Sequence, residues 1–121
     1  MPILEVELIL KPGEQLAASL TADLAKRAAE ALESRAAGTW VKLRTLEPEE
    51  YAEGDGGPAA GVFPVFVSVL KVDVPGPDRL AVEVARLTEA IAAVCNRPPE
   101  NVHILYLPPA RGRVAFGGRI V

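Results

Sequence analysis

The amino-terminal half of the chain passes from an apolar run to a helical periodicity and back to alternation. From Ile3 to Leu10 nearly every residue is apolar, which predicts a mostly covered strand. From Glu14 to Ala37 a leucine or alanine recurs at every fourth position, which predicts an amphipathic helix capped by Gly38. Alternation over Trp40 to Leu46 then predicts a second strand. The helical stripe consists of Leu16, Leu20, Leu24, Ala28 and Leu32.

The same order of elements returns in the second half. Residues 47–61 are polar and rich in Gly and Pro, which indicates an exposed connection. A strand is predicted from Pro64 to Val72, a helix from Pro77 or Asp78 to about Asn96, and a fourth strand from Val102 to Leu107. The apolar stripe of this second helix consists of Leu80, Val84, Leu87, Ile91 and Val94.

The two halves align with each other at a nearly constant offset. Pro2 matches Pro64, Pro12-Gly13 matches Pro75-Gly76, and Gly56-Gly57 matches Gly117-Gly118. We therefore predict an α+β, two-layer fold built from a tandem β-α-β repeat: a four-stranded sheet with two helices on one face. A ferredoxin-like domain has the same order of elements and is the alternative.

Length and composition limit the organisation and the partners. At 121 residues the chain is predicted to form a single domain, residues 1–121, made of two units at about 2–57 and 64–118. Thirteen basic and 16 acidic residues give a net charge of −3, so no polybasic surface for nucleic acid is expected. We find no signal peptide and no run of ~20 apolar residues, and therefore expect a cytoplasmic protein without a membrane partner.

The residues that most often bind metals are scarce. Cys95 is the only cysteine and His103 the only histidine. A disulfide within the chain is excluded, and no cluster suggests zinc. We therefore predict no metal site.

A proline stands directly after the initiator methionine. The small residue at position 2 favours removal of Met1, which would leave Pro2 with a free secondary amine. An α-amino group ordinarily titrates near pH ~8, and burial or nearby cations lower that pKa, so Pro2 is a candidate general base. The alternative is that Pro2 merely begins a strand, where a missing N–H costs little.

The chain also resembles a known family over its whole length, once per half. The stretch from Asn101 to Tyr106, followed by Gly112 to Gly118, resembles the second strand and terminal Gly-Gly hairpin of the short tautomerases. Together with Pro2 and the β-α-β repeat, it identifies a resemblance to the tautomerase superfamily, which includes 4-oxalocrotonate tautomerase and macrophage migration inhibitory factor. The resemblance implies a barrel-like homotrimer that uses no cofactor. It also implies proton transfer in an enol or dienol 2-oxo acid, with Pro2 as the base.

The same resemblance suggests residues that would bind the substrate. Lys11 lies close to the position of the family's substrate-binding arginine, and Lys42 falls where short members have a second-strand arginine. His103 is the equivalent of Lys42 in the second half. Phe116 resembles an aromatic that walls the site, and Arg113 could reach a neighbouring pocket. Solvated cations, an interior histidine and an interface aromatic are the corresponding structural alternatives.

The sequence also departs from some branches of the family. Lys71-Val72-Asp73 stands where dehalogenating members have a pair of arginines, and the tail lacks a carboxylate side chain that would activate water. We therefore predict a tautomerase that acts on a small-molecule carboxylate rather than a hydrolytic dehalogenase. The alternative from another class is a non-catalytic trimeric or ferredoxin-like module that binds a ligand or a protein.

Overall fold

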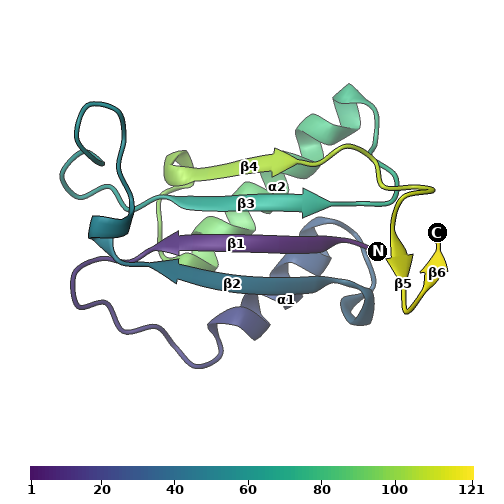
Figure 1. The fold of residues 1–121 in the computed structure, drawn as a ribbon, viewed down its shortest axis with the longest axis horizontal. Helices are drawn as coiled ribbons and strands as arrows, with labels where there is room; N and C mark the ends of the chain where they lie inside the picture. The colour runs from purple at the N-terminus through teal and green to yellow at the C-terminus, as the bar shows by residue number, and fades with distance from the viewer.

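The computed structural model describes residues 1–121 as two layers, a four-stranded sheet and a pair of helices that cover one of its faces (Figure 1). The predicted two-layer α+β fold with its tandem β-α-β repeat is confirmed. A small hairpin, β5–β6, stands beyond the end of the sheet at which β1 begins (Figure 1). The elements are β1 (Ile3–Ile9), α1 (Leu20–Ala31), β2 (Trp40–Leu46), β3 (Val65–Leu70), α2 (Pro77–Cys95), β4 (Val102–Tyr106), β5 (Ala115–Phe116) and β6 (Arg119–Ile120), with short 3-10 turns at Ala36–Gly38, Pro48–Glu50 and Pro99–Asn101.

The pairing of the strands separates this fold from the ferredoxin-like alternative. The order in the sheet is β2-β1-β3-β4. Within each unit the two strands are parallel and directly adjacent, as in the pairing of Ile3 with Trp40 and of Val65 with Val102. The two units meet through the antiparallel pair β1–β3, in which Val6 lies opposite Val67. In a ferredoxin-like domain each β-α-β unit is split by another strand, so that topology is excluded.

The core lies between the sheet and the helices. Alternate residues of β1 and β3 face the helices because side chains of a strand point to its two faces in turn. Neither helix is long and apolar enough to cross a membrane. The core consists of Leu4, Val6 and Leu8 from β1, Val65, Val67 and Val69 from β3, Leu20, Leu24 and Ala28 from α1, Leu87, Ile91, Ala92 and Cys95 from α2, and Leu32 and Val102.

The first helix is shorter than its periodicity predicts. It begins at Leu20 instead of Glu14 and ends at Ala31 instead of Ala37. Leu16 nevertheless packs against the core from the preceding loop, which is why the apolar spacing extends beyond the helix. The chain leaves the helix through Glu33, whose φ of 52° is left-handed. Gly38 closes a separate 3-10 turn, so its prediction as the helix cap is wrong.

A buried arginine holds the end of β1 opposite to Pro2. The Arg97 guanidinium donates to both carboxylate oxygens of Glu14, at 2.7 and 2.9 Å. It also donates to the carbonyls of Ile9 at 3.0 Å and Phe63 at 2.9 Å. The hydrogen bonds from Arg97 to Glu14 hold the pKa of the Glu14 carboxyl below its usual value. Arg97 therefore joins the end of β1, the loop after it and the residues that lead into β3.

Replacing Arg97 with methionine is expected to lower the free energy of unfolding by about 3 kcal/mol, because it leaves Glu14 without its cation and removes the donor from the carbonyls of Ile9, Phe63 and Cys95. The matched control is Arg27→Met, since Arg27 is exposed and its pair with Glu30, at 3.8 Å, is worth about 0–1 kcal/mol. Urea denaturation measures both. Equal losses in the two variants would contradict the structural role assigned to Arg97.

Candidate active site at the start of β1

A cavity opens beside Pro2, at the point where the chain enters β1. Its volume is about 330 Å³. Pro2 itself is buried, whereas Met1 is 48% exposed. The lining residues come from the chain start and from the connection between α1 and β2: Met1, Pro2, Ser34, Arg35, Ala37 and Gly38.

The register of the sheet explains why this connection lies beside Pro2. β2 is parallel to β1 and Ile3 pairs with Trp40, so the residues before Trp40 must lie near those before Ile3. The Trp40 amide donates to the Pro2 carbonyl at 3.1 Å. The Thr39 hydroxyl donates to the Arg35 carbonyl at 2.9 Å, which helps to fix the shape of the turn.

Arg35 brings a positive charge to the cavity, and the sequence analysis missed it. Its side chain is exposed and makes no hydrogen bond or ion pair within the chain, although it lines the same cavity as Pro2. The parallel pairing of the two strands in the first unit was the available signal. It places the residues before Trp40 at the start of β1, and Arg35 is the only basic residue among the five that precede Trp40.

Two aromatic side chains meet at the same end of the sheet. Trp40, at the start of β2, contacts Phe116 of the β5–β6 hairpin edge to face, with ring centroids 5.6 Å apart and planes at 84°. Phe116 is half-buried and Trp40 is 44% exposed. The structure thus places Phe116 at the Pro2 end of the sheet, and Trp40 is a second aromatic there that the sequence analysis did not select.

Lys42 lies on the open face of the sheet, away from the helices. Its ammonium nitrogen is 2.7 Å from Oε1 of Glu5, the residue opposite it in the register. Hydrogen bonding to Lys42 lowers the pKa of the Glu5 carboxyl. Lys42 does not line the cavity beside Pro2 within its own chain.

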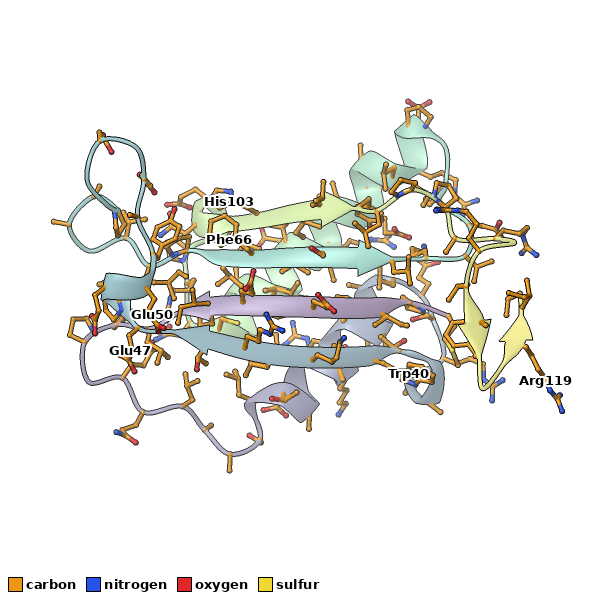
Figure 2. All side chains as sticks on the ribbon, viewed as in Figure 1. Trp40, Glu47, Glu50, Phe66, His103 and Arg119 are labelled. Carbon is orange, nitrogen blue, oxygen red and sulfur yellow. The ribbon has the colours of Figure 1, made fainter.

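Lys11 and His103 lie toward the opposite end of the sheet. Lys11 lies two residues beyond the end of β1, and a strand of seven residues is roughly 20 Å long. His103, near the start of β4, contacts Phe66 with ring centroids 5.4 Å apart. Figure 2 shows Phe66 and His103 at one end of the open face and Trp40 at the other. One chain therefore does not bring either residue to Pro2.

Arg113 lies in the turn between β4 and β5. Its guanidinium donates to the carbonyl of Pro109 at 2.8 Å and to that of Pro108 at 3.5 Å. The side chain therefore stabilises its own turn and is not among the residues that line the cavity.

The arrangement at the start of β1 favours an anion with an apolar part. A free guanidinium can form two parallel hydrogen bonds to a carboxylate. The Trp40–Phe116 pair offers an apolar surface at the same end of the sheet. No group of three or more His, Cys, Asp or Glu side chains is placed to hold a metal ion.

The fold matches that of several solved structures, whereas comparisons of the sequence find no match. No protein-family model matches the chain, and no curated protein matches its sequence. The structure superposes on "F6 fused 4-OT wild type asymmetric trimer" with a TM-score of 0.76 and 19% identity, covering 98% of this chain and 94% of the other.

Two further structures agree with the first. For Pt0534 inactivated by 2-oxo-3-pentynoate the TM-score is 0.72 at 14% identity, with 98% and 94% of the two chains covered. For macrophage migration inhibitory factor from Oncomelania hupensis the TM-score is 0.74 at 17% identity, with 99% and 82% covered. The chain therefore has the fold of the tautomerase superfamily, to which 4-OT and macrophage migration inhibitory factor belong.

Proposed function

We propose that this protein is a cofactor-free tautomerase of the 4-OT and macrophage migration inhibitory factor superfamily, which moves a proton within an enol or dienol 2-oxo acid. One observation carries the proposal. Pro2 and the unpaired Arg35 guanidinium line the same cavity, in a fold that fused 4-OT structures share.

The proposed base is the nitrogen of Pro2 after removal of Met1. With Met1 in place that nitrogen belongs to an amide and has no basic lone pair. Once free, the buried amine is less readily protonated than an exposed one, and the nearby cation of Arg35 has the same effect. Pro2 takes the hydroxyl proton of the enol, the carbonyl forms, and the distal carbon receives the proton from Pro2. The reaction is an isomerisation with no net gain or loss of protons.

Other groups at this end of the sheet would bind and orient the substrate. Arg35 would hold the carboxylate through its planar fork of N–H donors. Trp40 and Phe116 would cover the apolar part of the substrate and limit the access of water, which strengthens the electrostatic interactions at the site.

Neighbouring copies of the chain would complete the site. Lys11, Lys42 and His103 do not reach Pro2 within one chain, yet Lys42 and His103 are exposed on the open face of the sheet. Leu105 is 62% exposed on the same face, which suits a surface that another copy covers. The superposed fused 4-OT structure is a trimer. We therefore propose a homotrimer in which this face is buried, while a contribution of these three residues to a neighbour's cavity remains a prediction.

Pro2→Ala is expected to lower kcat/KM for ketonisation of an enol 2-oxo acid about 10²-fold or more, because a positioned general base contributes about 10²–10⁴-fold. The rate is measured with the Met1-free proteins by following the disappearance of the enol through its ultraviolet absorbance. A native protein that retains Met1 has an amide nitrogen at Pro2 and should be as slow as Pro2→Ala. Equal rates in all three proteins would rule out Pro2 as the base.

A covalent probe separates an inert protein from an unsuitable substrate. 2-Oxo-3-pentynoate inactivates Pt0534. In this chain the free amine of Pro2 would add across its triple bond, so the protein mass should rise by one whole reagent. An unmodified, inactive protein with an ordinary amino-terminal pKa would instead favour a non-catalytic binding module.

Arg35→Met is expected to raise KM about tenfold or more, because a charged hydrogen bond to a carboxylate contributes about 1.5–3 kcal/mol. Arg35→Lys should fall between that variant and the native protein, since lysine offers a point charge in place of a fork. Arg27→Met removes an exposed arginine from the helix α1 and serves as the matched control. Unchanged KM in Arg35→Met would show that another cation holds the substrate.

A further inference from the structure

Three polar side chains form a hydrogen-bonded network beneath the end of β3. The ammonium nitrogen of Lys71 is 2.8 Å from Oε1 of Glu83 on α2. The hydroxyl of Tyr106, at the end of β4, donates to Oε2 of the same carboxylate. Lys71 and Glu83 are only 18% and 14% exposed, and both line a groove of about 710 Å³ between the ends of the two helices. The network thus joins β3, α2 and β4 at one point.

The antiparallel register brings the backbone of Lys71 next to that of Pro2, although the network and Pro2 line different hollows. Ile3 of β1 pairs with Leu70 of β3, so one further step places Pro2 opposite Lys71. Opposite residues on antiparallel strands have Cα atoms about 4.5–5.5 Å apart. Leu4 and Val69 face the helices, and by alternation so do Pro2 and Lys71. Lys71 is therefore the charged residue that the extended register places opposite Pro2.

The other charges around this end are partly paired, whereas Asp78 and Arg79 line the same groove and form no ion pair. Arg111 binds Asp73 at 2.6 Å, and Arg86 binds Glu33 at 2.6 Å. The pKa of the Asp73 carboxyl is lowered, chiefly by its hydrogen bond to Arg111. Arg35 on the α1–β2 connection is the remaining unpaired cation that lines the cavity.

We propose that Lys71 and Glu83, held in place by Tyr106, form a positioning network that sets how strongly the Pro2 nitrogen binds a proton. This inference rests on the proposed function, in which Pro2 is the base. The positive charge of Lys71 disfavours a second positive charge on Pro2, and Glu83 offsets part of that effect. Neither side chain needs to touch the substrate.

Tyr106 suits the role of a fixed donor. Burial, and then its bond to Glu83, raise the pKa of the Tyr106 hydroxyl. It therefore remains protonated at neutral pH and keeps one oxygen of Glu83 occupied. The other oxygen is left to hold Lys71 on the side of the sheet that faces the helices.

The test is an NMR titration of the amine of Pro2 in the ¹⁵N-proline-labelled protein without Met1. Glu83→Gln leaves Lys71 uncompensated and should lower the pKa of Pro2 by about half a unit or more, whereas Lys71→Met should raise it by a similar amount. The double variant K71M/E83Q restores a net charge of zero at the pair and should return the pKa toward the native value. Glu100→Gln, which makes the same change of charge at an exposed position next to the start of β4, is the matched control.

Opposite shifts in the two single variants, with no shift in Glu100→Gln, would support the network. The acidic limb of kcat/KM against pH, where Pro2 loses its proton, should then move in the same direction as the titration. Identical pKa values in Glu83→Gln and Glu100→Gln, or shifts of the same sign in Lys71→Met and Glu83→Gln, would overturn it. The titration requires no turnover, so these outcomes are read separately from any failure of the ketonisation assay.

Discussion

The position of β1 at the centre of the sheet is the constraint on which the structure depends. It pairs in parallel with β2 on one side and antiparallel with β3 on the other, and Leu4, Val6 and Leu8 are almost completely buried beneath the helices. The start of the chain is therefore held in a fixed place. The turn before β2, the end of β3 and the β5–β6 hairpin all lie near it (Figure 1). As a consequence of the topology, Arg35 lines the same cavity as Pro2, while the Lys71–Glu83 ion pair and the Trp40–Phe116 pair lie at the same end of the sheet.

The two ends of the sheet are related by the internal repeat but differ in chemistry. At the Pro2 end the cavity is open and contains the unpaired Arg35. At the other end the Ile9 amide donates to the Pro64 carbonyl, and Arg97 with Glu14 forms a buried ion pair beside it. Pro64 is also an internal residue whose nitrogen lies in an amide bond. The duplicated architecture therefore provides one candidate site and one structural clamp.

Local patterns predicted the helices and strands, whereas the bounds of α1 and the residues near Pro2 depend on long-range contacts. Alternation fixed β2 at Trp40–Leu46, and the repeat gave the two-layer sheet. The apolar stripe that includes Leu16 predicted too early a start for α1, because a loop residue can pack against the core as well as a helical one. The partnership of Glu14 with Arg97 spans 83 residues and leaves no local signal. Selecting Arg35 required the parallel register, while Lys42 and His103 were selected by family position and lie on the open face.

The proposed chemistry requires that the Pro2 nitrogen is a free base, and the intact mass of the purified protein shows whether it is. Excision of Met1 turns an amide into a secondary amine at the mouth of the cavity, and no other change in the chain can do so. We expect a mass that is short by one methionine residue. A mass that includes Met1 in the protein isolated from its natural source would contradict the proposed chemistry.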